Sequence, residues 1–398
     1  MRPPLRLAEA RFAATLAWQQ TWRRARRSLG AFIGIAGALT LVLVQLGFQA
    51  ALEESAVRIH RQLTGELVVV ARHFQGFRDL DWFERAGLAQ AHAHPQVAAV
   101  APLMLDAILV RDRESQAMSS IWCIGIDPDQ PAVRFAVGRA DTQLLRLPGR
   151  VLFDRESRPR YGDVLTRLDR DGRASMLTAL ASVPLQAELE IVGSYRLGAT
   201  IAVEGTLLMS EATLAGVLGR SRERLTLAVL QLAPGARPAQ VAAELAALLP
   251  ASLRVMTLDE MIAMEQHLWA SETPIGLIFA LCTGIGLVVC GIFIWQLLGQ
   301  LIDENLHEYV VLRIMGYNAA FFALVLLLTA LLYTAAALPL AILAAAVLDV
   351  FSAGSTHLDT HLTVGRIVFV MLAGTGTALC TGALAGLRLR RADPAALL

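Results

Sequence analysis

Lysine is absent from this sequence of 398 residues, since all 35 residues counted as Lys or Arg are arginine. A phosphate-binding loop of the G-x-x-x-x-G-K-[ST] type needs a lysine to reach the terminal phosphates of a nucleotide. Schiff-base catalysis also needs a lysine amine. We therefore expect that the chain has neither chemistry, and that any ATP it uses is bound by another chain.

Cysteine is scarce, with four residues in the whole chain. Cys123 lies in the polar middle of the chain, whereas Cys282, Cys290 and Cys380 lie in apolar runs. A single thiol in the polar part cannot form a disulfide framework. We expect the other three to be small apolar side chains without a redox role.

Motifs for catalysis and metal binding are also missing. The sequence has no G-x-S-x-G or H-E-x-x-H motif, so we predict that the chain is not an enzyme. Two histidine groups have spacings that a metal could use: His92 with His94, and His357 with His361 around Asp359. Neither group has a third partner in the sequence, so we interpret them as histidines of surface loops and predict no metal site.

Apolar residues are abundant. They make up 55% of the chain, the mean hydropathy is +0.53, and the net charge of +1 does not indicate a nucleic-acid partner. Four stretches without Asp, Glu, Arg or His are long enough to cross a bilayer, which takes ~20 helical residues. They are residues 28–52, 273–302, 318–348 and 367–387. The lack of ionisable residues in these stretches argues against an ion-coupled transporter.

Arginines cluster directly before the first stretch and directly after the last. They are Arg23, Arg24, Arg26 and Arg27, and then Arg388, Arg390 and Arg391. The positive-inside rule then predicts a multi-pass membrane protein with both termini in the cytoplasm. Residues 53–272 and the short loop 349–366 would be periplasmic, and residues 303–317 and the tail 388–398 cytoplasmic. The first stretch exceeds the apolar run of ~7 to 15 residues in a signal peptide, so we expect it to be retained.

Residues 1–27 contain apolar and aromatic side chains at helical spacing among arginines. Phe12 and Leu16 form one i, i+4 pair, and Trp18 and Trp22 form another. This pattern is typical of an amphipathic helix at the membrane interface. A disordered basic tail is the alternative.

Residues 53–272 have the composition of an α+β domain. Alternating and apolar runs predict strands at 66–71, 97–109, 121–126 and 187–192, and helical spacing predicts helices at 81–92, 211–218 and 238–249. Apolar residues at both ends of the domain suggest helices that continue the membrane spans outward as a stalk. They are Ala56, Ile59 and Leu63, and then Leu258, Ile262 and Trp269.

Residues 303–317 lie between the second and third stretches. Their pattern predicts a short surface helix in which Glu304 and Glu308 share a face, Leu312 and Met315 continue that face, and Gly316 ends the helix. Two carboxylates on one face suit a basic groove on a partner. A solvated connector is the alternative.

Several of these segments resemble a known family. The sequence EYVVLRIMG (Glu308–Gly316) resembles the E-x-x-x-L-R-x-x-G motif of FtsX/MacB-like ABC permeases, and RADPAAL (Arg391–Leu397) resembles their closing motif. Shorter segments resemble the DevC-type permeases. They are Gln45–Phe48, Leu197–Thr206, Thr273–Gly276, Glu308-Tyr309, Met315–Tyr317 and Ala392–Pro394. Arg313 stands where many relatives have lysine, a change that retains the charge.

The resemblance implies a MacB-like architecture: four transmembrane helices with a large α+β extracytoplasmic domain inserted between the first and second spans. It implies a homodimer that pairs with an ABC ATPase subunit, which binds ATP and Mg²⁺, and with a periplasmic membrane-fusion adaptor and a TolC-like outer-membrane channel. Export of glycolipid or another hydrophobic substrate is the implied task. The alternative is an ATPase-coupled scaffold that controls a periplasmic cell-wall hydrolase.

The resemblance also implies roles for particular residues. The residues that contact the ATPase would be Glu304, Glu308, Leu312, Arg313, Gly316 and Tyr317. The stalk residues that transmit motion would be Ala56, Ile59, Leu258 and Ile262.

Overall fold

The computed structural model describes residues 7–23, 29–77, 79–111, 118–135, 139–158, 161–178, 187–198, 204–356 and 362–391. The chain divides into two compact units. One is the continuous segment Leu52–Thr273, and the other combines Met1–Ala51 with Pro274–Leu398. We call them the sheet unit and the helical unit. The sheet unit differs by one residue at each end from the range 53–272 expected from the sequence.

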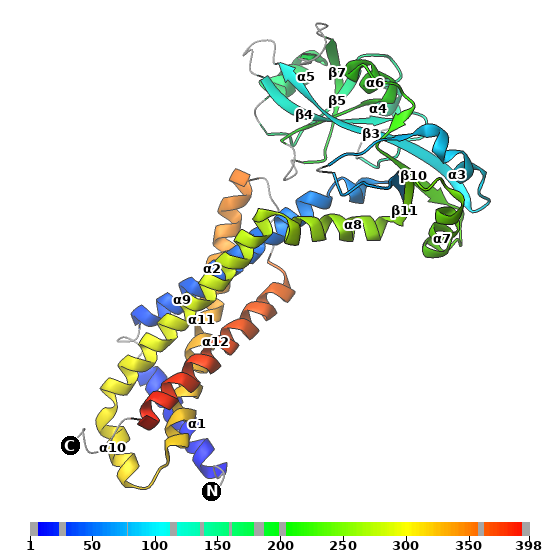
Figure 1. The fold of residues 1–398 in the computed structure, drawn as a ribbon. Helices are drawn as coiled ribbons and strands as arrows, with labels where there is room; N and C mark the ends of the chain where they lie inside the picture. Colours follow the sequence, from blue (N-terminus) through cyan, green and yellow to red (C-terminus); the bar gives the residue numbers. More distant parts are fainter. Residues whose placement is uncertain are drawn as a thin grey trace. The chain divides into compact units, whose positions relative to one another are not determined.

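The helical unit consists of long α-helices that lie side by side (Figure 1). They are α1 (Leu7–Arg23), α2 (Leu29–Val57), α9 (Pro274–Glu304), α10 (Leu306–Ile314), α11 (Ala319–Thr356) and α12 (Val364–Arg391). Among the described residues, α2, α9, α11 and α12 are long and apolar enough to cross a membrane. These four helices lie where the sequence predicted apolar spans.

The ends of two helices differ from the expectation. α11 continues through Asp349 to Thr356, and α12 begins at Val364, before Arg366. Part of the segment expected to be the loop 349–366 is therefore helical, because helical hydrogen bonding does not have to stop where the apolar run stops. Pro339 lies inside α11 without ending it.

Small residues bring the helices of this unit close together. A Cβ atom on Gly34 would clash with the ring of Phe293, and one on Gly286 would lie 2.7 Å from Val42. Glycine at such contacts lets the backbones of membrane helices approach each other. The shared core includes Leu39, which is fully buried.

The sheet unit contains a nine-stranded sheet with the order β11-β1-β10-β3-β4-β8-β5-β7-β6. Its strands are β1 (Leu67–Ala71), β3 (Val97–Arg111), β4 (Met118–Ile126), β5 (Arg150–Asp154), β6 (Ala174–Thr178), β7 (Glu188–Tyr195), β8 (Thr206–Ser210), β10 (Leu227–Leu232) and β11 (Leu253–Thr257). β6 also pairs with the end of β3, at Val110 and Arg111. Six strands from β3 to β6 therefore close into a barrel.

The long strand β3 belongs to both halves of this sheet. Its first part, Val97–Leu103, pairs with β10, and its second part, Leu103–Arg111, pairs with β4. β1 lies between β10 and β11 and is buried along its whole length. Leu67 and Val69 belong to one core and Val68 and Val70 to the other, as expected for an uninterrupted apolar strand.

Helices and short turns complete the sheet unit. They are η1 (His60–Gln62), η2 (Arg85–Leu88), α3 (Ala89–Ala93), α4 (Arg139–Leu144), α5 (Val164–Asp171), α6 (Glu211–Leu218), α7 (Pro238–Leu248), α8 (Leu258–His267) and the π-helix η3 (Leu268–Glu272). A two-stranded sheet pairs β2 (Phe83–Glu84) with β9 (Arg224–Leu225).

The sequence predicted these elements unevenly. The strands expected at 66–71, 97–109, 121–126 and 187–192 are β1, β3, β4 and β7, and the helices expected at 211–218 and 238–249 are α6 and α7. The helix expected at 81–92 is wrong. This segment begins with β2, because Phe83 pairs with Leu225, and continues as η2 and the short α3.

Candidate functional site

The segment expected to be one helix over 303–317 is divided at Asn305. α9 continues to Glu304, and α10 begins at Leu306. The Asn305 side chain is 1% exposed, and its Nδ2 donates a hydrogen bond of 2.7 Å to the carbonyl of Leu301. Glu304 is therefore the last residue of α9 and Glu308 lies in the first turn of α10, so the single helix expected from the sequence is interrupted between them. Asparagine competes with regular helix geometry through such bonds, and this is the signal that the sequence offered.

The buried side of α10 is held by α1. Tyr309 is 4% exposed, and its hydroxyl donates a hydrogen bond of 3.3 Å to Oε1 of Gln20. Its ring packs edge-on against Phe322 of α11, with 5.5 Å between the ring centroids. Ala13 and Ala17 of α1 are fully buried in the same core. Contacts with α1 thus fix one side of α10.

An aromatic group connects α1 with the turn between α10 and α11. The ring of Phe321 lies 4.6 Å from that of Tyr317 and 5.8 Å from that of Phe12. The helix expected in residues 1–27 is present as α1, and Trp18 is 54% exposed. The sequence indicated its Phe12 and Leu16 stripe but gave no sign that α1 packs on α11, because the contacts join residues ~300 positions apart.

Gly316 ends α10 as the sequence predicted. Its φ is +99°, a region that favours glycine. The amide of Gly316 donates to the carbonyl of Arg313 at 3.1 Å, and the amide of Tyr317 donates to the carbonyl of Leu312 at 3.2 Å. These two bonds form a Schellman motif, which satisfies carbonyls at the end of the helix.

The other side of α10 is exposed and mixes charge with apolar surface. Glu304, Glu308 and Arg313 are exposed, whereas Leu312 and Tyr317 are half-buried. Large apolar side chains lie beside the charges, with exposed fractions of 45% for Val311, 78% for Ile314 and 69% for Met315. Exposed apolar side chains next to charged ones are typical of a protein interface. We call this exposed side, together with Glu304, the α10 face.

The predicted stalk residues divide into two sets. Ala56 lies in the last turn of α2, and Leu258 and Ile262 lie on α8. α2 ends at Val57, so Ile59 lies in the turn before η1 and is 3% exposed. The helical stalk after the first span is therefore shorter than expected. The second stalk is helical through α8.

The histidine groups give no metal site in the described part of the chain. Among the described residues, no cluster of three or more His, Cys, Asp or Glu side chains could hold a metal ion. His92 is exposed, as expected, but His94 is 8% exposed and its Nε2 lies 3.2 Å from Oε2 of Glu244. His94 is therefore not a surface-loop residue, because α7 covers it. His357, Asp359 and His361 lie outside the described residues.

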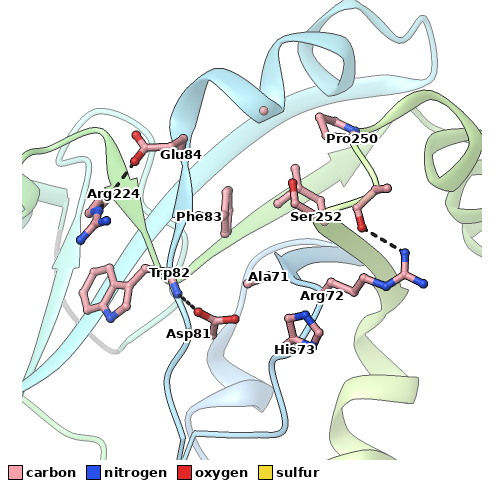
Figure 2. A pocket seen from close by; sticks show the side chains of 13 residues that line it. Ala71, Arg72, His73, Asp81, Trp82, Phe83, Glu84, Arg224, Pro250 and Ser252 are labelled. Carbon is pink, nitrogen blue, oxygen red and sulfur yellow. Dashed lines mark hydrogen bonds and ion pairs between the residues drawn. The ribbon is translucent and has the colours of Figure 1, made fainter.

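A hollow of about 730 Å³ lies beside the end of β1, between β2 and the connection from α7 to β11 (Figure 2). The charged groups on its rim are already paired. Arg224 lies 3.6 Å from Glu84, Oδ1 of Asp81 accepts a hydrogen bond from the amide of Trp82, and Arg72 donates to a carbonyl of the α7–β11 connection. Both signs of charge are present, so this hollow does not indicate one class of ligand.

Residues 280–394 match the FtsX-like permease C-terminal family. This part of the chain is an FtsX-like permease domain. The matched residues include α10 and the whole of the E-x-x-x-L-R-x-x-G segment, so the resemblance to FtsX/MacB-like ABC permeases is confirmed. The DevC subtype stays a prediction. No curated protein matches the sequence.

Two solved structures are similar to about half of this chain. The periplasmic region of MacB from Actinobacillus actinomycetemcomitans is 8% identical, with a TM-score of 0.35 over 51% of this chain and 93% of its own. The extracellular domain of the noncanonic ABC-type transporter YknZ from Gram-positive bacteria is 13% identical, with a TM-score of 0.34 over 48% of this chain and 98% of its own. These scores are too low to assign a fold. The assignment of residues 280–394 to a family depends on the family match.

Proposed function

We propose that this permease is the membrane subunit of an ABC export complex and that it transmits ATP-driven motion from a separate ATPase to the sheet unit. The α10 face is the observation that supports this function. It presents Glu308 and Arg313 beside exposed Ile314 and Met315, while the opposite side of the helix is held by Tyr309. A partner bound to this face would therefore act on a helix that is packed against α1 and α11, and not on a loop.

The connections of α10 determine where such a movement would go. α10 follows α9 after one residue, Asn305, and the motif at Gly316 leads into α11 through Tyr317. Because the core of Tyr309, Phe321 and Phe322 joins α10 to α1 and α11, displacement of α10 displaces helices that cross the bilayer. We propose that Ala56, Ile59, Leu258 and Ile262 relay this displacement at the two ends of the sheet unit.

The remaining partners follow from the same proposal. The ATPase supplies ATP and Mg²⁺, since this chain has no lysine for a phosphate-binding loop. A second copy of the chain, a periplasmic membrane-fusion adaptor and a TolC-like outer-membrane channel complete the complex. The location is the bacterial inner membrane with both termini in the cytoplasm, and the substrate class is glycolipid or a similar hydrophobic molecule.

The test replaces the charge on the α10 face. The chain is co-expressed with ABC ATPase subunits from the same genome, and the complex is purified through a tag on the chain. Glu308→Arg would place a positive charge against a basic groove, which costs on the order of several kcal/mol at a desolvated contact. We expect at least a tenfold loss of complex formation or of coupled ATP hydrolysis.

The matched control is Glu223→Arg, the same change at an exposed position of the sheet unit, which should leave the complex intact. A Glu308→Arg variant that assembles and couples like the parent, at equal membrane levels, would show that α10 is a solvated connector. The partner that co-purifies also separates export from signalling. An adaptor favours export, whereas a cell-wall hydrolase favours the scaffold.

A further inference from the structure

Both ends of the sheet unit meet at one buried group of side chains. η1 follows α2, and at the other end α8 continues as the π-helix η3 before Thr273, which is extended with φ −99° and ψ 149°. A π-helix is rare and is frequently found at functional sites. α8 packs against η1 and β1. The chain therefore ends the sheet unit with an irregular helical turn, and the helix before that turn lies against the segment that follows α2.

Glu265 of α8 is the centre of this group and is 1% exposed. Its Oε1 accepts a hydrogen bond of 3.0 Å from the indole Nε1 of Trp269 in η3. Its Oε2 accepts a bond of 3.1 Å from the amide of Phe77, and this oxygen lies 3.7 Å from Nε2 of His60 in η1. One carboxylate thus touches η3, η1 and the chain that follows β1.

The backbone that follows β1 passes close to the carboxylate of Glu265. Gly76 has φ +146°, and a Cβ atom there would lie 2.8 Å from Oε2 of Glu265. The ring of Phe77 stacks on His60 at 4.1 Å and lies 6.1 Å from that of Trp122 on β4. Contacts therefore run without interruption from Trp269 through Glu265 and Phe77 to a strand of the barrel.

Glu265 is held by hydrogen bonds and not by an ion pair with His60. Burial lowers the pKa of His60 to about 3, so its ring is neutral at pH 7. Burial raises the pKa of Glu265, and the bonds from Trp269 and Phe77 oppose that increase. A buried carboxylate without its donors would be costly, so the carboxylate and the two N–H groups hold each other in place.

We propose that Glu265 is a positioning residue for the transmission of motion, because it fastens η3 to the amide of Phe77. The ring of Phe77 in turn stacks on His60 of η1 and lies near Trp122 of β4. This inference depends on the proposed function, since it names the place where motion of the second stalk enters the sheet unit. A movement of η3 pulls on Trp269, and Glu265 passes it to Phe77 and the barrel.

The experiment measures hydrogen–deuterium exchange in the complex of the full chain with its ATPase, with and without ATP and vanadate. In the parent, nucleotide should change exchange both in α10 and in residues 74–77 with β4. Glu265→Leu should keep the response of α10 and lose the response of residues 74–77 and β4. Without nucleotide, the Phe77 amide should exchange at least about tenfold faster, because its hydrogen bond to the Glu265 side chain is lost.

Two further variants separate transmission from folding. Glu265→Gln keeps one acceptor oxygen and should retain part of the response, and it decides the matter if the leucine variant does not fold. Asp259→Asn removes a carboxylate from an exposed position of the same helix and should behave like the parent.

The outcomes distinguish the two proposals. If α10 responds to nucleotide and both Glu265 variants keep the parent's response in residues 74–77 and β4, the role of Glu265 is wrong and the coupling function stands. If α10 itself does not respond in the parent complex, the coupling function is wrong and the role of Glu265 falls with it.

Discussion

Single ionisable side chains occupy the interior of the sheet unit. Asp154 is fully buried and accepts hydrogen bonds from the amides of Leu197, at 2.9 Å, and Gly198, at 3.1 Å. Burial raises its pKa, whereas these amide bonds lower it. The start of the DevC-like segment Leu197–Thr206 is therefore held by a carboxylate that lies 43 positions earlier in the chain.

His60 gives the sheet unit a dependence on acid. Histidine in the unfolded chain has a pKa near 6.5, whereas His60 in the folded unit has a pKa of about 3. Below pH 6.5 the unfolded chain binds a proton that the folded chain does not bind. The unfolding free energy should therefore fall between about pH 6.5 and pH 3, by on the order of several kcal/mol.

The prediction is tested with His60→Phe, whose ring can still stack on Phe77. The measurement is unfolding of the full chain in detergent between pH 7.5 and pH 4.5, followed by tryptophan fluorescence. Glu265 acts in the opposite direction, since its raised pKa favours the folded state as the pH falls. The comparison of parent with variant removes that contribution. Equal acid sensitivity in both chains would contradict the predicted role of His60.

At the scale of elements, α10 shows what its local sequence could and could not reveal. The helix and its end at Gly316 were predictable, because glycine after a helical pattern is a stop signal. The break at Asn305 was missed, since the glutamates on both sides suggested one continuous face. The hydrogen bond between Gln20 and Tyr309 could not be predicted locally, because neither segment has a sequence pattern that indicates contact with the other.

Gly316→Val tests the end of α10. A β-branched residue at φ +99° costs on the order of 1–3 kcal/mol. No atom lies within 4 Å of the Cβ position, so the cost is conformational and not a clash. We expect weaker coupling of ATP hydrolysis with little loss of ATPase binding, together with faster amide exchange at residues 316 and 317.

The matched control is Gly216→Val in α6, where the added Cβ also has open space. This control should couple normally. If both variants couple like the parent, the geometry at the end of α10 is not needed for transmission.

At the scale of the whole molecule, the sequence predicted the long helices and the most apolar strand better than it predicted how the strands pair. Long apolar helices and the uninterrupted strand β1 have strong local patterns. β5 and β8 are five residues long each and were missed, because a short buried strand has no period that separates it from a buried helix. The closure of the barrel by β6 on β3 depends on distant pairing, which no local pattern expresses.

The orientation across the membrane is a prediction for the whole chain. Arg173 is an exposed residue of the sheet unit, and His307 is an exposed residue of α10. In a chain with Cys380 replaced by serine, a membrane-impermeant maleimide should label Arg173→Cys in intact spheroplasts. It should label His307→Cys only after the inner membrane is opened. The reverse pattern would place the sheet unit in the cytoplasm and α10 outside it.

The pairing of β1 has a consequence for biosynthesis. β1 lies between β10 and β11, yet both partners leave the ribosome roughly 150 residues or more after β1 itself. Translation of β11 ends at Thr257, shortly before α9 begins at Pro274. The first span is therefore made long before the sheet can close, and an all-apolar strand stays unpaired in the meantime. Such strands are prone to aggregate, so we expect the yield of folded sheet unit to depend on protection of β1 until β11 has been made.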